Sequence, residues 1–112
     1  MKPRFKNLPT LKLLPNKGIV KLSLEPSRIE EFLSNFESQK DNIRAFEGCE
    51  FLELYCDKHN TNIFFTYSYW KAESDLENYR HSDLFKGIWA KTKPMFNGKP
   101  EAWSVDKLAS LK

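Results

Sequence analysis

Four side chains in the middle of the chain are of types that could carry out chemistry: Trp70, Tyr79, Arg80 and His81. An unperturbed histidine titrates near neutral pH and can transfer protons. A tyrosine hydroxyl can donate a hydrogen bond, and arginine carries a permanent positive charge. We predict that Trp70, Tyr79 and His81 are catalytic and that Arg80 binds substrate. Because His81 lies two residues from Tyr79, a helix would direct these two side chains to different sides.

Bulky aromatic residues could form the walls of a pocket around these groups. The candidates for substrate-binding walls are Phe36, Tyr67, Tyr69, Phe85 and Trp89. Packing in an ordinary core is the alternative explanation for them, since a small domain of a sheet and helices needs large side chains in any case. Arg80 has an alternative as well, because it could pair with Glu77 or Asp83, three positions away on a helix surface.

A strand must place Trp70, and a helix must place Tyr79 after it. Six of the nine residues in 62–70 are aromatic or β-branched apolar residues, which are enriched in strands. They fall on both faces of an extended chain, so this strand needs cover on both sides. Residues 73–80 then predict a short helix with Leu76 and Tyr79 on its inner side, and Ser82 can cap a second helical segment.

The remaining elements follow from the spacing of apolar residues. Alternation predicts strands at 18–24, 49–56 and 102–108. Between the first two, apolar residues at helical intervals predict a helix of about 17 residues, which Gly48 ends. Ser27 stands three residues before Glu30, the spacing of a capping box at the start of that helix.

The resulting order is strand, helix, strand, strand, helix, strand. This order is typical of α+β ferredoxin-like (βαββαβ) domains, in which helices cover one face of an antiparallel four-stranded sheet. Large side chains would lie uncovered on the other face, and a lone monomer would then expose a costly apolar patch. We therefore expect a homodimer that associates through the sheet face.

The distribution of charge separates the chain into two parts. Residues 1–17 hold five Lys or Arg and no acid, whereas 18–112 hold 13 Lys or Arg against 15 Asp or Glu. We predict a basic N-terminal arm at 1–17 and a single domain at 18–112. The folded part lacks the basic stripe and the aromatic strand signature of RNA-binding sheets, so no nucleic-acid partner is expected. No apolar run is long enough to span a bilayer, and we expect a cytoplasmic protein without a membrane partner.

Two cysteines support that location. Cys49 and Cys56 lie seven residues apart on one predicted strand, which places them roughly 23 Å apart at about 3.3 Å per residue and on opposite faces. They cannot bond to each other within one chain. Two cysteines at this spacing make no metal motif, so no metal site is predicted.

The strand that ends in Trp70 leads into an L-x-x-Y-R-x-S-x-L-F-K pattern. Its residues are Leu76, Tyr79, Arg80, Ser82, Leu84, Phe85 and Lys86. With the βαββαβ order, this pattern resembles the antibiotic biosynthesis monooxygenase family over residues 18–108. The resemblance implies a dimeric α/β barrel and a tryptophan near the cavity.

The resemblance also implies a function: a monooxygenase that acts on a small aromatic or quinol-like compound in a pocket between sheet and helices, with molecular oxygen and no cofactor. A non-catalytic dimer that binds a small molecule is the alternative. One departure bears on the chemistry, because many family members carry a histidine where Tyr79 stands. The haem-degrading branch places its iron-ligating histidine near 87–89, where this chain has none, so haem degradation is disfavoured.

Overall fold

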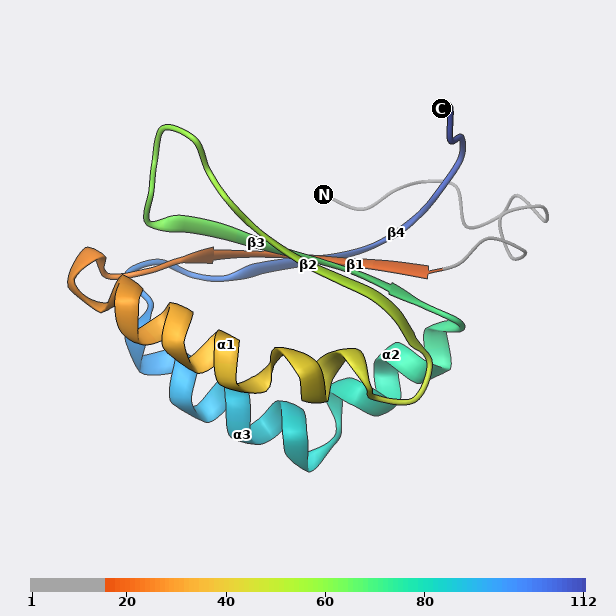
Figure 1. Cartoon of the computed structure of the whole chain (residues 1–112), viewed down its shortest axis with the longest axis horizontal. Coiled ribbons are helices and arrows are strands. Elements are labelled where there is room, and N and C mark those ends of the chain that lie inside the picture. Colours follow the sequence, from red (N-terminus) through yellow and green to blue (C-terminus); the bar gives the residue numbers. More distant parts are fainter. Residues whose placement is uncertain (1–15) are drawn as a thin grey trace.

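Four strands with alternating side chains pair into one antiparallel sheet, and helices cover only one of its faces (Figure 1). The computed structural model describes residues 16–112. The elements in chain order are β1 Asn16–Ser23, the 3₁₀ turn η2 Pro26–Arg28, α1 Ile29–Arg44, β2 Cys49–Cys56, β3 Ile63–Trp70, α2 Glu73–Arg80, α3 Asp83–Thr92, the 3₁₀ turn η3 Lys93–Met95 and β4 Glu101–Asp106. This confirms the predicted α+β ferredoxin-like fold.

The strand order in the sheet is β2-β3-β1-β4, so the first and third strands lie in the centre. β1 pairs antiparallel with both β3 and β4, and β2 pairs antiparallel with β3. The helices pack below the even-numbered positions of the two central strands. There Leu22, Phe64 and Phe32 form the main core with Leu24 and Met95.

The predicted boundary between arm and domain differs from the observed start of the sheet. β1 begins at Asn16, so the last two residues of the predicted basic arm belong to the central strand. Residues 1–15, the rest of that arm, lie outside the described residues, and the arm itself stays a prediction. β4 ends at Asp106, two residues before the predicted end of the last strand.

The first helix does not begin with the predicted capping box. Ser27 lies inside the 3₁₀ turn η2, and no side chain caps either η2 or α1. Pro26 favours this tight turn, because its fixed φ suits the first position of a helix. Arg28 instead pairs with Glu31 one turn later, with Nε donating to Oε1 at 2.9 Å and Nη2 to Oε2 at 3.1 Å.

A β-bulge at the start of β2 changes the predicted side of one cysteine. The register shifts between Cys49 and Phe51, so Cys49 lies opposite Trp70 while Cys56 lies opposite Phe64. The extra residue of a bulge reverses the alternation of side chains. Both cysteines therefore belong to the helix-covered side of the sheet, contrary to the prediction of opposite faces. Both are free thiols, as expected.

The opposite, open face of the sheet carries an aromatic cluster. The ring of Tyr69 lies 4.9 Å from that of Phe51 and 5.4 Å from that of Tyr67, measured between centroids. The Lys17 ammonium lies 3.0 Å from the centroid of the Tyr69 ring, and this lysine is 3% exposed. Lys17 lowers the pKa of Tyr69, while burial raises the pKa of Tyr67 to about 12.

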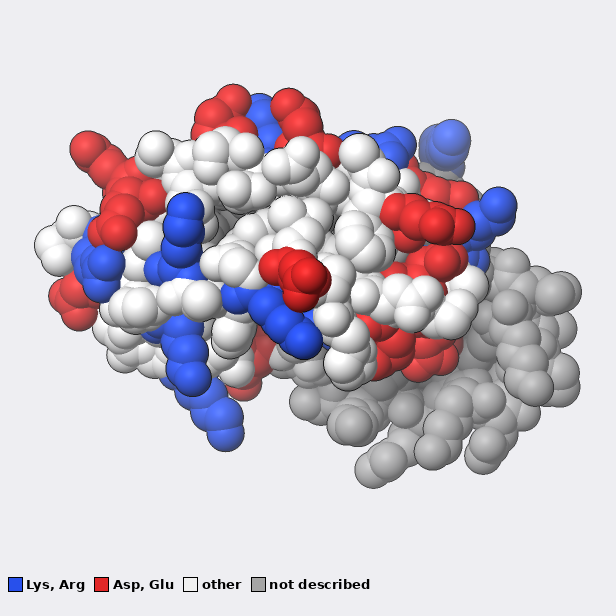
Figure 2. Space-filling view, turned by 90° about the horizontal axis from the view of Figure 1, so that it is seen from below, with Lys and Arg blue, Asp and Glu red and all other residues white. Residues whose placement is uncertain are grey.

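The helices of residues 16–112 are short or polar. None of them combines the length and the apolar content needed to cross a membrane. Seen from the helix side, Lys and Arg are interspersed with Asp and Glu, and much of the middle of this face is uncharged (Figure 2).

Candidate functional site

A cavity of about 360 Å³ lies between the sheet and the helices. Its walls are predominantly apolar, and they come from the even-numbered face of the sheet and from the inner sides of α1, α2 and α3. On the sheet side, the cavity reaches from Trp70 at the end of β3 to Ala102 on β4. A concave, mostly apolar space with a few polar groups is the usual form of a small-molecule site.

Trp70 lines one end of the cavity and, at 1% exposed, is the largest of the fully buried side chains among the described residues. Its indole Nε1 donates a 2.8 Å hydrogen bond to the Ser68 hydroxyl, two positions earlier on the same face of β3. The only donor of an indole is thus already in use. The hydrogen-bond donor of Trp70 is therefore held by the strand and is not free for a ligand.

Tyr79 lies at the cavity, on the inner side of α2, and its ring stacks on Trp70. Phe46 and Phe85 meet the Tyr79 ring edge-on, at centroid distances of 5.4 and 5.2 Å. Burial raises the pKa of Tyr79 to about 12, and neighbouring Cys49 adds to the rise. The hydroxyl therefore keeps its proton at neutral pH and can donate a hydrogen bond, but it cannot act there as a base.

Four of the predicted substrate-binding residues line the cavity. Phe36 of α1 and Phe85 and Trp89 of α3 line it, and Arg80 joins them at the end of α2. Phe85 and Trp89 stack with their ring planes 14° apart. The Arg80 Nη1 lies 3.5 Å from Glu77 Oε2, so the alternative pairing with Glu77 is present. An exposed pair of this kind is weak, and the guanidinium can still serve a ligand.

Tyr67 and Tyr69 do not lie at this cavity, contrary to the prediction that they form its walls. Both project from the open face of the sheet, opposite Ile19 and Lys17 of β1. Residues one apart on a strand point to opposite faces, so the strand that directs Trp70 inward must direct Tyr69 outward. The same alternation was readable in the sequence.

His81 lies outside the cavity as well. Its side chain is 76% exposed, and its Nδ1 is 2.9 Å from the carbonyl oxygen of Glu77. It occupies the end of α2, one residue past Arg80 and on a different side of the helix from Tyr79. A solvated histidine held by its own helix cannot exchange a proton with a ligand in the cavity.

Several residues at the cavity were not predicted to be there. They are small or polar side chains on the same face of the sheet as Trp70, and aliphatic ones from the helices: Thr66, Ser68, Leu76 and Ile88. Counting back in steps of two from Trp70 would have found Ser68 and Thr66. No sequence signal places Pro100 or Ala102, because their position at the cavity depends on β4 pairing beside β1.

Residues 16–112 hold no group of three or more His, Cys, Asp or Glu side chains that could bind a metal ion. Of the ionisable groups at the cavity, Tyr79 keeps its proton and Arg80 is positively charged. The third, Glu101, lies at the far rim, where its carboxylate is 3.8 Å from the Lys21 ammonium. The described part of the cavity thus offers hydrogen-bond donors and a positive charge at the end where Trp70 and Tyr79 stack.

Comparisons with known proteins connect this architecture to a family. Residues 18–91 match the family model described as antibiotic biosynthesis monooxygenase. The chain is 29% identical over 76 residues to the Bacillus subtilis protein named "Putative monooxygenase YcnE", a match that covers 68% of this chain and 80% of that protein.

Solved structures share the fold. A conserved protein from Methanosarcina mazei superposes with a TM-score of 0.80 at 24% identity, over 89% of this chain and 99% of the other. A Caulobacter crescentus protein named "putative antibiotic biosynthesis monooxygenase" gives a TM-score of 0.78 at 20% identity, over 89% of this chain and 96% of the other.

Proposed function

The chain belongs to the antibiotic biosynthesis monooxygenase family, and from that premise we propose that it is a cofactor-independent monooxygenase acting on a small hydroxylated aromatic compound. The observation that carries the proposal is the cavity lined by the stacked rings of Trp70 and Tyr79 and by Arg80. Aromatic walls suit a flat ring, and the two polar groups suit a hydroxyl that becomes an anion.

The reaction requires few functional groups of the protein, because the substrate supplies the electrons that reduce dioxygen. A hydroxylated ring gives up its hydroxyl proton to solvent water as it binds, and the bound phenolate reduces dioxygen. A carbon–hydrogen bond of the ring is replaced by a carbonyl, one oxygen atom enters the product, and the other leaves as water. Phenol and dioxygen thus give a quinone and water, with all atoms and electrons balanced.

Arg80 and Tyr79 would favour the ionised substrate over the neutral one. A positive charge close to a phenolate lowers the pKa of the phenol, and the Tyr79 hydroxyl can donate a hydrogen bond to the same oxygen. Because the pKa of Tyr79 is raised to about 12 by burial, this donor is intact over the whole neutral range. The apolar walls keep water from the reacting oxygen. Tyr79 and Arg80 are therefore assigned to binding and charge stabilisation.

Oxygen uptake measured with a panel of dihydroxylated and polyhydroxylated aromatic compounds tests the proposal. A hydrogen bond to a charged group contributes about 1.5–3 kcal/mol, so Tyr79→Phe and Arg80→Met should each lower kcat/KM about 10- to 100-fold. His81→Ala is the matched control, because it removes an ionisable side chain that lies outside the cavity. Absence of uptake with every compound would contradict the activity, and a loss confined to His81→Ala would contradict the site.

A non-catalytic binding protein of the same fold is the second candidate. The observation in its favour is that, among the described residues, the end of the cavity where Trp70 and Tyr79 stack has no group able to act as a base at neutral pH, since Glu101 lies at the far rim. Such a protein would bind a hydroxylated aromatic compound and release it unchanged. Product formed in many-fold excess over protein excludes this candidate, whereas saturable binding without product supports it.

The open face of the sheet supports the expected homodimer. No helix of residues 16–112 covers this face, which carries the cluster of Phe51, Tyr67 and Tyr69 together with Trp103. Burying a large side chain contributes about 1.5–3 kcal/mol, so pairing two such faces would offset the cost of their exposure. We propose that a second copy of the chain occupies this face around a two-fold axis.

Sedimentation equilibrium tests the dimer. Phe51→Glu places a charge within the aromatic cluster and should shift the protein to a monomer at micromolar concentration. Glu50→Lys is the control, because it changes a charge at the neighbouring, exposed position. A wild-type monomer would contradict the dimer. Cytoplasmic residence and the absence of nucleic-acid and membrane partners stay predictions.

A further inference from the structure

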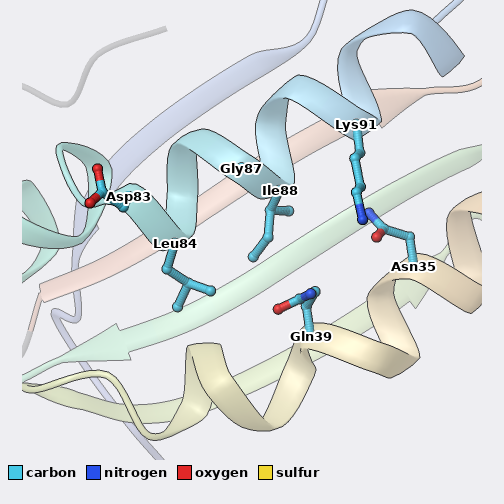
Figure 3. Close-up of a pocket in the computed structure, with 7 residues that line it drawn as sticks. All are labelled: Asn35, Gln39, Asp83, Leu84, Gly87, Ile88 and Lys91. Carbon is cyan, nitrogen blue, oxygen red and sulfur yellow. The ribbon is translucent and has the colours of Figure 1, made fainter.

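A second hollow lies on the outer surface of the helix layer, in the groove between α1 and α3 (Figure 3). Its volume is about 210 Å³. Asn35 and Gln39 of α1 face Leu84 and Ile88 of α3 across the groove, and Lys91 reaches over it toward Asn35. The groove thus has an aliphatic side, formed by Leu84 and Ile88, and a polar rim. The polar side chains of this rim can form hydrogen bonds to a hydroxyl.

Ile88 is the one described residue that lines both this groove and the inner cavity. α3 contributes Leu84 and Gly87 to the outer hollow and Phe85 and Trp89 to the inner one, and Ile88 stands between the two sets. A single aliphatic side chain, held by packing alone, therefore forms part of the partition between solvent and the aromatic cavity.

The contact between the two helices at this place is apolar. Among residues 16–112, no hydrogen bond or ion pair between side chains joins α1 to α3. The groove is also wide beside the partition, because a Cβ at Gly87 would meet no atom within 4 Å. A rotamer change of a half-buried side chain takes place in nanoseconds to microseconds, far faster than enzyme turnover.

We propose that the groove between α1 and α3 is an entrance to the cavity for a hydroxylated aromatic ligand, and that Ile88 is its gate. The chemical class of this ligand rests on the proposed function. The polar rim receives the hydroxyl, and the aliphatic side receives the ring. The cavity can also be approached past β4, where Ala102 is both exposed and part of the cavity lining. The protein thus has two routes to one site.

The rates of 2-naphthol binding, followed by stopped-flow fluorescence, test this proposal without any turnover. Ala102→Trp narrows the route past β4 and makes binding depend on the groove. Adding Gly87→Trp should then fill the groove and lower both the association and the dissociation rate constants by a factor of about ten. A substitution on the route but outside the cavity should change the association and dissociation rate constants by the same factor. The Kd is the ratio of these two constants, so it should stay within a factor of about two.

Two further variants complete the test. Lys91 also lines the groove, so Lys91→Trp is used in place of Gly87→Trp if the Gly87→Trp protein does not fold. Ile88→Ala removes most of the gate and should raise the association rate constant several-fold. Circular dichroism and thermal unfolding establish that each variant is folded.

Two results would overturn the proposal: association in the double variants as fast as in Ala102→Trp alone, or no binding of 2-naphthol to the wild-type protein. If the double variants bind 2-naphthol more slowly but the protein consumes no oxygen, the entrance is supported and the monooxygenase activity is contradicted. The two proposals can therefore fail separately.

Discussion

The rings of Trp70 and Tyr79 stack with their centroids 5.2 Å apart and their planes at 28°. This contact joins the last residue of β3 to the inner side of α2, and it stands at one end of the cavity. Aromatic pairs of this geometry contribute about 0.5–1.5 kcal/mol beyond the burial of their area. The same two side chains thus hold α2 on the sheet and line one end of the cavity.

Ser68→Ala should destabilise the fold through Trp70. The substitution removes the acceptor of the buried indole N–H, and an unsatisfied buried donor costs about 1–3 kcal/mol. The free energy of unfolding, measured by urea denaturation, should fall by that amount. Ser104→Ala is the control, since Ser104 lies on β4 and is exposed, and its change should stay within about 0.5 kcal/mol. Equal effects of the two substitutions would contradict the assigned hydrogen bond.

The stability of the protein should fall in alkaline solution through Tyr79. Its folded-state pKa of about 12 lies above the ordinary value of 10.0, so the folded state keeps a proton that the unfolded chain loses. The stabilisation is fully present below pH 10 and is lost as the pH rises toward 12.

The measurement is the free energy of unfolding of the wild type minus that of Tyr79→Phe, from pH 9 to pH 11.5. This difference should decrease by about 2 kcal/mol over that range. A difference that does not change with pH would show that the Tyr79 phenol is not buried as described.

Ser82→Ala should shorten or loosen α3. The Ser82 hydroxyl accepts a 3.1 Å hydrogen bond from the Phe85 amide at the start of that helix, and loss of such a cap costs about 0.5–2 kcal/mol. Ser27→Ala is the matched control at the start of α1, where no side chain caps the helix. Urea denaturation should show a clear loss for the first variant and almost none for the second. The reverse order would support the capping box that the sequence suggests.

Alanine substitutions at two glycines should act in opposite directions. Gly48 has a φ of +87°, and a Cβ there would lie 2.3 Å from Cγ of Asp75, so Gly48→Ala should cost more than about 1 kcal/mol. Gly87 lies within α3 and has open space at its Cβ, so Gly87→Ala should stabilise the protein by about 0.5–1 kcal/mol. Thermal unfolding of the two variants checks both signs, and a loss at Gly87 would contradict the open groove.

Much of the fold could be predicted because local patterns agree with the global arrangement. The alternation in 49–56 and the helical spacing in 73–80 match β2 and α2 to the residue. The start of α1 was predicted less well. Ser27 has the right spacing for a cap, but Pro26 and the pairing of Arg28 with Glu31 favour a 3₁₀ turn instead. Competing local contacts of similar energy cannot be ranked from spacing alone.

The sequence by itself determined the order and type of the elements, the ferredoxin-like topology and the position of Trp70 at the end of an inward-facing strand. These follow from periodicity, which acts over a few residues. Only the tertiary structure decided which aromatic side chains share a space. Tyr79 and Arg80 reach the cavity while His81, the next residue, stays in solvent, because the angle at which α2 meets the sheet selects one side of the helix. The separation of cavity and groove by Ile88 arises in the same way, from the packing of α3 beside α1.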